Sequence, residues 1–589
     1  MRRTLPLLVL LASAATAQPV AVEITVAALP EGARLGVRGD TPPLAWDRSR
    51  PMELREGVAT ATVPFPTGTG RVAYKVVVEG ADGEVTWEPG DNRILLPGRM
   101  TADLRAFGGR QTDLPLITLS QAELAEDLDV LRRVVVALHP GLRLHNTEAE
   151  LDAISDRLWR QAGALGRSYG EAIPMPEVYL MVAEAIASIR DGHTRVSMYN
   201  QDAYTSSVLY ARPDRVPFAF RLVGGRMIVT GDATAEHVLP RGTEVLTLDG
   251  RPVTDVIAAL LPYASADGGN DAKRRDELQV TGLLPPAERF DVISSLLFEP
   301  EGDLALTVRR PDGTEAELHV PRTTQDARRD TLWARDPSLP RSNDDLLRYH
   351  LRDDGTALLS IGTFATFNLD ADYDAWLIGA FRRMREDGAE RLVVDLRDVA
   401  GGMDSAAMLL FRHLLREPAT ISQWQSHTAY DVVPESLRPY LSSWSGEFLD
   451  VSARVTRADD GTFRLPPRPP RSVEPAPDAF DGPTAVLVDA TASSATFILA
   501  QAIQETGASV LVGQETGGSL MGLNAGQVAF LTLPNSGVVI DLPLIGSRPS
   551  EPGPDRGVVP DIVVPPDAEA VIAGRDPELE AAIATLTAR

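Results

Sequence analysis

The chain of 589 residues contains no cysteine. This absence excludes a disulfide scaffold, a thiolate nucleophile, and any metal or iron–sulfur site with cysteine ligands. Lysine is almost absent too, because only Lys75 and Lys273 among the 57 basic residues are lysines. Acidic residues outnumber basic ones by 82 to 57, and the net charge of -25 makes nucleic acid and anionic membrane surfaces poor partners.

Long apolar runs are scarce as well, and none is long enough for a membrane helix. A short apolar stretch at residues 5–15 follows Arg2 and Arg3 and ends at the small-x-small sequence Ala15-Thr16-Ala17. This pattern is typical of a secretory signal peptide with its cleavage site. We therefore expect residues 1–17 to be a signal peptide and the mature chain to be exported, either periplasmic or extracellular; an uncleaved anchor is the alternative.

The rest of the chain has a globular composition, 44% hydrophobic and 24% charged, and its length suggests about four domains. Residues 18–110 predict a β-sandwich, because apolar residues alternate at 20–26 and two further strands follow at 58–63 and 72–78. Residues 111–200 predict a helical subdomain. Its first two helices begin at capping boxes, Ser120 to Glu123 and Thr147 to Glu150.

The second half predicts a β domain followed by an α/β domain. Strand patterns return over 201–325, where the hairpin at 239–250 resembles that of a PDZ-like domain. Over 326–589, buried strands at 392–396 and 485–489 alternate with helices, which indicates a mostly parallel sheet. A segment rich in proline and arginine, at about 417–480, interrupts this pattern as an insertion. The predicted fold class is therefore multidomain α/β.

Two strand ends in the α/β domain are candidates for chemistry, because ligands bind at the carboxyl ends of parallel strands. One is followed by Gly401-Gly402, where the backbone can present N–H groups to a ligand. The other leads through Thr491-Ala492-Ser493-Ser494 into a helix, whose N-terminus can hold an oxyanion. Taken alone, each feature is more often a helix cap or a turn.

Together with other motifs, these two resemble the serine peptidases of the C-terminal-processing (tail-specific) protease family, in the branch of the tricorn protease core and the interphotoreceptor retinoid-binding protein repeats. The motifs occur in family order and span about 111–570. They are Leu138-His139-Pro140-Gly141-Leu142, Asp191-Gly192-His193-Thr194, Asp395-Leu396-Arg397 with Gly401-Gly402, Thr491 to Ala495, Gly513 to Gly518, and Gly557-Val558-Val559-Pro560-Asp561. The resemblance implies a crotonase/ClpP-like α/β catalytic core and no metal or organic cofactor.

The resemblance also implies roles for individual residues. Ser493 would be the nucleophile, and the N–H groups of Ser494 and of Gly401 or Gly402 would form the oxyanion hole. One branch uses a lysine base about 25 residues after the serine, but Gly518 stands there. The other branch uses a histidine, which matches His193, and a glutamate that helps to orient the site, which matches Glu551. These residues would act as an oriented base that activates a hydroxyl.

Three positions depart from the family pattern. Gly192 stands where a serine often precedes the histidine, Val399-Ala400 stands where Asn-Gly is common, and Thr496 stands where the helix often carries glutamate. Asp395 and Arg397 are interpreted as a charge pair that shapes the loop, and His139 as structural.

The β-sandwich resembles a starch-binding-type carbohydrate module through Leu44 to Asp47, Tyr74 to Val76 and Trp87 to Arg93. The resemblance implies that Trp46 and Trp87 stack on sugar rings; a spacer domain without glycan binding is the alternative. The sequence as a whole predicts an exported serine endopeptidase that acts on a peptide or protein, with a polysaccharide as a possible further partner. The alternatives are an inactive ligand- or polysaccharide-binding relative and a hydrolase of another acyl substrate.

Overall fold

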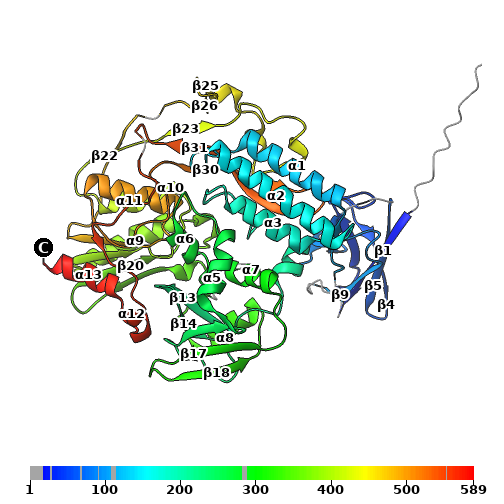
Figure 1. The fold of residues 1–589 in the computed structure, drawn as a ribbon, viewed down its shortest axis with the longest axis horizontal. Coiled ribbons are helices and arrows are strands. Elements are labelled where there is room, and N and C mark those ends of the chain that lie inside the picture. Colours follow the sequence, from blue (N-terminus) through cyan, green and yellow to red (C-terminus); the bar gives the residue numbers. More distant parts are fainter. Residues whose placement is uncertain are drawn as a thin grey trace, which may run out of the picture. The chain divides into compact units, whose positions relative to one another are not determined.

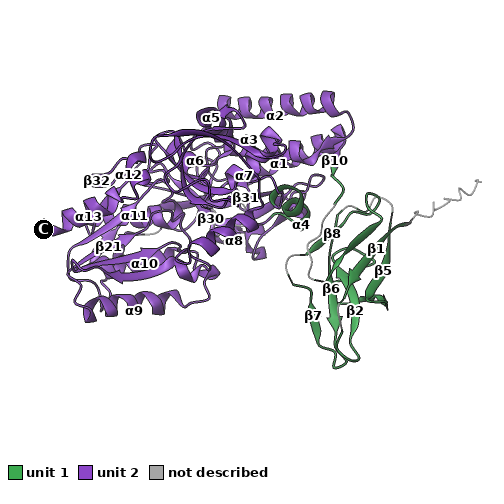
Figure 2. Cartoon of the chain, turned by 90° about the horizontal axis from the view of Figure 1, so that it is seen from below, with its two compact units in different colours: residues 1–117, 201–210 green, residues 118–200, 211–589 purple. Residues whose placement is uncertain are grey.

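The structure is a computed structural model, and it describes residues 17–26, 29–66, 69, 71–89, 92–107, 114–281, 288–467, 469–551 and 553–588. Residues 1–16 of the predicted signal peptide lie outside the described residues. The chain forms two compact units, residues 1–117 with 201–210 and residues 118–200 with 211–589 (Figure 2). None of the helices in the described part is long and apolar enough to cross a membrane.

The first unit is built from two sheets around one apolar core. One sheet has the order β4-β5-β1-β9, and the other has the order β3-β2-β6-β7 with β8 paired to β6. Alternate residues of β5 (Val58–Pro66) are buried, as its sequence pattern predicts. The other strands are β1 (Ala17–Thr25), β2 (Arg34–Gly39), β3 (Arg50–Pro51), β4 (Glu53–Arg55), β6 (Val72–Glu79), β7 (Val85–Trp87), β8 (Arg93–Leu95) and β9 (Ala102–Ala106).

Residues 201–210 were predicted to begin the PDZ-like domain, but they pack in this first unit. They form α4 (Ala203–Thr205) and the π-helical turn Ser206–Tyr210. The hydroxyl of the buried Tyr204 accepts a hydrogen bond from the N–H of Ile117 at 2.6 Å. Tyr204 and Ile117 are 87 positions apart, so no local sequence pattern predicts this contact.

The second unit begins with three helices that lie side by side (Figure 1): α1 (Gln121–Leu138), α2 (Glu148–Tyr169) and α3 (Met175–Ala187). Both predicted capping boxes are present, at Ser120 and Thr147. A long hairpin of β30 (Leu523–Thr532) and β31 (Val539–Arg548) belongs to a sheet of order β24-β30-β31-β23-β26-β25, and β12 (Arg195–Val196) pairs with β31. Strands of the predicted insertion, β23 (Gln425–Thr428) to β26 (Phe463–Arg464), therefore extend this sheet.

The next elements along the chain form an antiparallel sheet of order β13-β14-β15-β17-β18, with β16 paired to β15. The described residues of the segment between β16 and β17 include three α-helices. The strands are β13 (Phe218–Val223), β14 (Arg226–Asp232), β15 (Glu244–Leu248), β16 (Arg251–Pro252), β17 (Leu304–Arg309) and β18 (Glu315–Val320). The helices are α5 (Val253–Leu260), α6 (Asp271–Asp276) and α7 (Arg289–Phe298), and α8 (Gln325–Arg335) follows the sheet.

The last part of the unit is an α/β layer of order β19-β20-β21-β28-β29-β32, parallel from β20 onward. Apolar side chains of α9 (Tyr373–Glu386), α10 (Asp404–Leu414) and α11 (Ser494–Thr506) share one core with the sheet, and α13 (Pro577–Thr587) packs in a second core. In Figure 1, α11 and α13 lie beside this sheet, where they contact β29 and β28, respectively. The strands are β19 (Leu347–Leu351), β20 (Thr356–Ile361), β21 (Arg391–Asp395), β28 (Thr484–Val488), β29 (Val510–Gly513) and β32 (Ile562–Val563).

The observed architecture is thus multidomain α/β with an N-terminal β-rich module, as predicted. Buried runs such as Leu392-Val393-Val394 and Ala485-Val486-Leu487 form adjacent parallel strands, because helices cover both faces of the sheet.

Candidate functional site

The site lies where two neighbouring strands end. β21 and β28 pair in parallel, with Asp395 opposite Leu487, so the segments that follow them leave the sheet at the same edge. One segment contains Gly401-Gly402 and the other contains Ser493. The two strand ends predicted as candidates for chemistry are therefore adjacent. They lie at the carboxyl edge of the parallel sheet, where such sheets bind ligands.

Ser493 is the N-cap residue of α11, with extended backbone angles of φ -132° and ψ 176°. Its side chain makes no capping hydrogen bond, which leaves the hydroxyl free for another role. The hydroxyl instead donates to the carbonyl oxygen of Ala400 at 3.1 Å. Among the described residues no hydrogen bond joins Ser493 to His193, so the predicted pair is not engaged in this conformation.

The turn at Ser493 is tight and is held against Gly401. Ser494 has a φ of +52°, in the left-handed region that residues other than glycine rarely adopt. Gly401 has a φ of +114°, and a Cβ there would lie 2.6 Å from the Cβ of Ser494 and 2.9 Å from the carbonyl oxygen of Ser493. Gly402 instead meets the backbone of Phe364, only 2.0 Å from its imagined Cβ. Each glycine therefore allows a contact that no other residue allows.

The predicted oxyanion-hole residues are brought together with the nucleophile. No hydrogen bond is recorded within the described chain for the N–H groups of Gly401, Gly402 or Ser494. The peptide bond between Ala400 and Gly401 turns its carbonyl toward the Ser493 hydroxyl. Because C=O and N–H point in opposite directions across a trans peptide, the N–H of Gly401 is directed away from that hydroxyl.

His193 lies in a loop fixed by Asp191, after α3. The Oδ1 atom of Asp191 accepts hydrogen bonds from the N–H of His193 at 2.8 Å and of Thr194 at 3.2 Å. The imidazole is half-buried, and its Nδ1 atom is buried without a hydrogen-bond partner. Burial disfavours the charged imidazolium and lowers the pKa of His193 to about 4, although the carboxylate of Asp191 acts in the opposite sense. His193 is therefore neutral at pH 7, as a general base must be.

Lys273 lies beside the nucleophile segment, which its position in the sequence did not indicate. Its buried ammonium group donates to the carbonyl oxygen of Thr491 at 3.1 Å and lies 3.9 Å from Glu277. The Thr491 hydroxyl donates to Asp276, at the end of α6. The charges of Lys273 and Glu277 both act on the pKa of His193, so α6 lies next to both the predicted base and the predicted nucleophile.

Glu551 is exposed, and no hydrogen bond or ion pair is recorded for its side chain in the described part of the chain. The loop that carries it is nevertheless anchored near the site. Asp555 accepts hydrogen bonds from the N–H of Gly269 at 3.3 Å and from the hydroxyl of Ser519 at 3.1 Å. The role of Glu551 stays a prediction.

Arg397 holds the C-terminal helix to the end of β21. Its guanidinium group donates to Asp395 at 2.7 and 2.9 Å, to Asp576 at 2.8 Å from each of two nitrogens, and to Glu578 at 2.7 Å. The predicted charge pair is present and is part of this larger cluster. His139 is also buried and bonded: its Nδ1 accepts from the N–H of Gly141 at 3.0 Å, and its Nε2 lies 3.1 Å from Asp191.

Two groups of potential metal ligands lie in the described part of the unit, and we assign a metal to neither. In the group Asp191, His193 and Asp267, both oxygens of Asp191 already accept hydrogen bonds, including one from Asn524 at 2.8 Å. In the second group, Asp276 accepts from Thr491, Asp398 pairs with Arg221, and Asp489 accepts backbone N–H groups at 2.8 and 3.0 Å. A metal-free mechanism remains a prediction.

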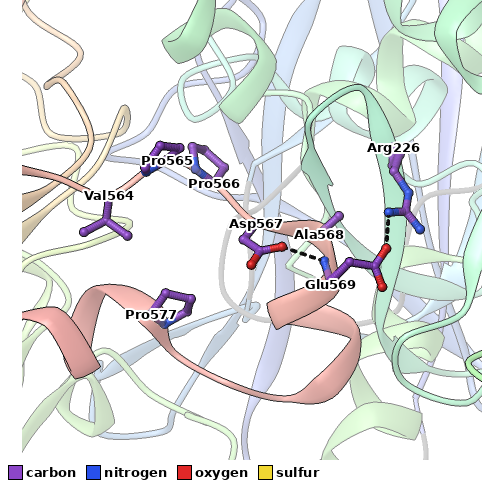
Figure 3. Close-up of a pocket in the computed structure, with 8 residues that line it drawn as sticks. All are labelled: Arg226, Val564, Pro565, Pro566, Asp567, Ala568, Glu569 and Pro577. Atoms are coloured by element: carbon purple, nitrogen blue, oxygen red, sulfur yellow. Dashed lines mark hydrogen bonds and ion pairs between the residues drawn. The ribbon is translucent and has the colours of Figure 1, made fainter.

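A surface pocket of about 470 Å³ lies elsewhere in this unit and contains none of the predicted site residues (Figure 3). Arg226 donates to Glu569 across it at 2.6 Å. Prolines at 565, 566 and 577 are three of the six other lining residues. Its two carboxylates are engaged, Glu569 with Arg226 and Asp567 with the N–H groups of the helix that it caps, so we assign the pocket no catalytic role.

In the first unit, Trp46 and Trp87 lie close together. Their ring centroids are 6.1 Å apart with an angle of 52° between the ring planes, and Trp87 is 41% exposed. The guanidinium carbon of Arg38 lies 5.2 Å from the centre of the Trp87 ring. Arg38 itself is held by the carbonyl oxygen of Trp46 at 3.1 Å and by Glu79. The two predicted sugar-stacking residues thus share one supported surface.

The fold and the site together define a class: hydrolases with a serine at a helix N-terminus on an α/β sheet. Residues 355–564 match the model of peptidase family S41, and residues 19–104 match the model of the starch binding domain. The chain therefore contains a peptidase family S41 domain and an N-terminal starch-binding-type module, which makes it a serine-type peptidase. These matches confirm the family predicted from the motifs.

Solved structures with a similar fold include mature CPAF complexed with lactacystin, at 16% identity and a TM-score of 0.54, which covers 79% of this chain and 97% of that chain. A second structure of mature CPAF has 16% identity and a TM-score of 0.51, with coverage of 77% and 94%. The photosystem II D1 C-terminal processing protease has 16% identity and a TM-score of 0.34, with coverage of 77% and 97%. No curated protein sequence matches the chain.

Proposed function

We propose that the chain is an exported serine endopeptidase that cleaves peptide bonds through an acyl-enzyme on Ser493. The observation that carries this proposal is the packing of the Ser493–Ser494 turn against Gly401. It sets a hydroxyl without a capping role beside N–H groups at the positive end of a helix. That arrangement suits a tetrahedral intermediate with a negatively charged oxygen.

The reaction proceeds in two halves. In the first, His193 takes the proton of the Ser493 hydroxyl while the oxygen bonds to the substrate carbonyl carbon. The carbon–nitrogen bond then breaks, and the leaving amine receives the proton from His193. In the second half, water attacks the ester through the same base and releases the acid. Ser494 supplies one N–H to the oxyanion, and Gly402 is the better second donor because the N–H of Gly401 is directed away.

His193 reaches Ser493 only after a local change. The Ser493 hydroxyl now donates to Ala400, so it must rotate toward the imidazole before the proton can move. Catalytic hydrogen bonds often form only when substrate is bound. The charges of Lys273 and Glu277 act on the pKa of His193, and Lys273 also donates to the carbonyl oxygen of Thr491, two residues before Ser493. His193 and Ser493 are therefore both close to α6, so only a local movement is needed to bring them together.

The substrate is a peptide in an extended conformation, and the antiparallel sheet from β13 to β18 is the PDZ-like domain that would bind it by strand addition. Glu551 would help to orient the site. Export follows from the leader-like residues 1–17.

The decisive experiment is active-site labelling with a fluorophosphonate probe. Wild type should be labelled, and Ser493→Ala should lose both labelling and peptidase activity, by about 10⁴-fold or more in kcat. Ser494→Ala should keep most activity, because only its backbone N–H is used. A folded wild type that neither labels nor cleaves casein, a general protein substrate, would favour the inactive ligand-binding alternative.

A second function, glycan binding by the first unit, is favoured by one observation. Trp46 and Trp87 form a supported and partly exposed aromatic pair, and aromatic rings stack on the apolar faces of sugars. We infer that this pair binds an α-glucan and keeps the peptidase near a polysaccharide.

A further inference from the structure

The predicted base lacks the partner that a catalytic histidine needs. The Nδ1 atom of His193 is buried without a hydrogen bond. A buried polar atom without a partner costs about 1–3 kcal/mol, so such atoms in a folded protein need an explanation. A general-base histidine is normally fixed by an acceptor on the ring nitrogen that faces away from the nucleophile. The question is which acceptor serves His193.

A second buried atom without a partner lies beside it. Asp267 is 2% exposed, and its Oδ2 atom has no hydrogen-bond partner. Its Oδ1 atom accepts from the N–H of Gly192 at 2.9 Å, which fixes the carboxylate next to the residue before His193. One ring nitrogen of His193 and one carboxylate oxygen of Asp267 lie within 4.8 Å of each other. Two neighbouring side chains therefore each hold a buried polar atom without a partner.

The other acids considered for this role are already hydrogen-bonded or are exposed. Asp191 accepts four hydrogen-bonding groups: the N–H groups of His193 and Thr194, the amide of Asn524, and the ring of His139. Glu277 pairs with Arg289 at 3.1 Å. Glu551 is exposed without a recorded partner.

Gly192 makes the approach of Asp267 possible. A Cβ at position 192 would lie 3.3 Å from the Oδ2 atom of Asp267, tighter than an ordinary contact. The absence of a side chain at the residue before the base therefore leaves space for this carboxylate. The loop that carries Asp267 is also clamped, because Gly268 donates to the carbonyl of Arg190 at 2.9 Å and Gly269 donates to Asp555.

From these contacts we propose that Asp267 is the positioning residue of the site: its carboxylate accepts the Nδ1–H of His193 and directs Nε2 toward Ser493. A rotation of the two side chains closes the gap between them. This inference rests on the proposed function and adds the acid that orients its base. Asp267 touches neither the substrate nor the nucleophile, so it acts only through His193.

The charges around Asp267 agree with this role. Burial and the neighbouring carboxylate of Asp191 raise the pKa of Asp267 to about 7, while the N–H of Gly192, Lys273 and Arg274 act in the opposite sense. The ionised carboxylate can accept the imidazole proton and stabilise an imidazolium, whereas the protonated one cannot. Activity in kcat/KM should therefore rise through about pH 7, not at the pKa near 4 of His193 itself.

The test compares Asp267→Asn with wild type in the full chain. We expect a loss of about 10²–10⁴-fold in kcat with little change in KM, because an amide at this position favours the wrong imidazole tautomer. The rising limb near pH 7 should also disappear. Asp127→Asn is the matched control: Asp127 is also buried with a raised pKa, but its hydrogen bonds go to Asn535 and Ser536, so its activity and pH profile should match wild type.

A second measurement does not depend on whether the variant folds. Nitrogen NMR of ¹⁵N-histidine-labelled wild type, assigned with His193→Gln, should show His193 protonated at Nδ1 above pH 7. An Nε2-protonated ring, or an Asp267→Asn enzyme with wild-type kcat and pH profile, would overturn the proposal. A failure of the proposed function gives a different result: in that case Ser493→Ala or His193→Ala would keep its activity.

Discussion

At the scale of single residues, Gly401 meets a steric requirement that the Ser493–Ser494 turn itself imposes. A side chain there would collide with the nucleophile turn, at 2.6 Å from the Cβ of Ser494, and its φ of +114° disfavours any other residue. We expect Gly401→Ala to displace the turn and to lower kcat/KM by about 100-fold, since a shift near 1 Å in an active site has that effect. Steady-state kinetics on a peptide substrate measure this loss.

Gly379 offers the matched control for that substitution. It lies in α9, and nothing stands within 4 Å of a Cβ built on it. Gly379→Ala should leave kcat/KM unchanged and raise the free energy of unfolding by about 0.5–1 kcal/mol. A Gly401→Ala enzyme with most of its kcat/KM intact would show that the turn does not depend on this contact.

Some residues of the site could be predicted from the sequence and others could not. Ser493, Gly401 and Gly402 carry local signals, because a helix start and a glycine pair follow buried strands. Lys273 and Asp267 carry none, since they lie in the segment between two strands of the antiparallel sheet and reach the site only through tertiary packing. A substitution of Lys273 is therefore expected to disturb the site, because its ammonium group holds the carbonyl oxygen of Thr491.

At the scale of the elements, Arg397 ties α13 to the sheet. Its guanidinium group serves three carboxylates, on Asp395, Asp576 and Glu578, and burial of these groups makes an unpaired charge costly. Arg397→Met should lower the free energy of unfolding by roughly 1–3 kcal/mol. Arg352→Met, which breaks an exposed pair with Asp354, should change it by less than about 0.5 kcal/mol. Urea denaturation of each variant measures both values.

This effect should depend on pH in a defined direction. Burial alone would raise the pKa of Asp576, but the hydrogen bonds and the charge of Arg397, together with the N–H of Leu579 and the charge of Arg221, lower it overall. An acid with a lowered pKa in the folded state contributes stability above its unfolded pKa of about 3.9 and loses that contribution as the pH falls. The difference between wild type and Arg397→Met should thus be full at pH 7 and should shrink below about pH 4. An equal difference at both pH values would contradict this account.

The elements themselves were predicted well where periodicity and capping agree. The helix after Ser120 and the parallel strands β21 and β28 follow directly from capping boxes and buried runs. The assignment of residues 201–210 could not be predicted, because Tyr204 and Ile117 are 87 positions apart. Local patterns determine elements, whereas such packing depends on the whole chain.

At the scale of the whole molecule, the chain combines two units with different chemistry. The second unit carries the proposed serine nucleophile on an α/β sheet, and the first carries an aromatic pair on a β-sandwich. The hydrogen bonds that hold Ser493 and His193 come from the second unit alone, and those that hold Arg38 beside Trp87 come from the first. The two activities should therefore be separable by single substitutions.

Trp87 provides that separation. In the full chain, Trp87→Ala should weaken binding to soluble starch by about tenfold or more, since loss of a stacked ring removes about 1.5 kcal/mol. Trp159→Ala is the matched control, because Trp159 is equally exposed at 41% but lies on α2 of the second unit. Affinity electrophoresis in gels with starch or dextran measures binding, and both variants should keep wild-type peptidase kcat/KM. If starch does not slow the migration of wild type, the first unit is a spacer. The same conclusion follows if starch slows Trp87→Ala as much as it slows wild type.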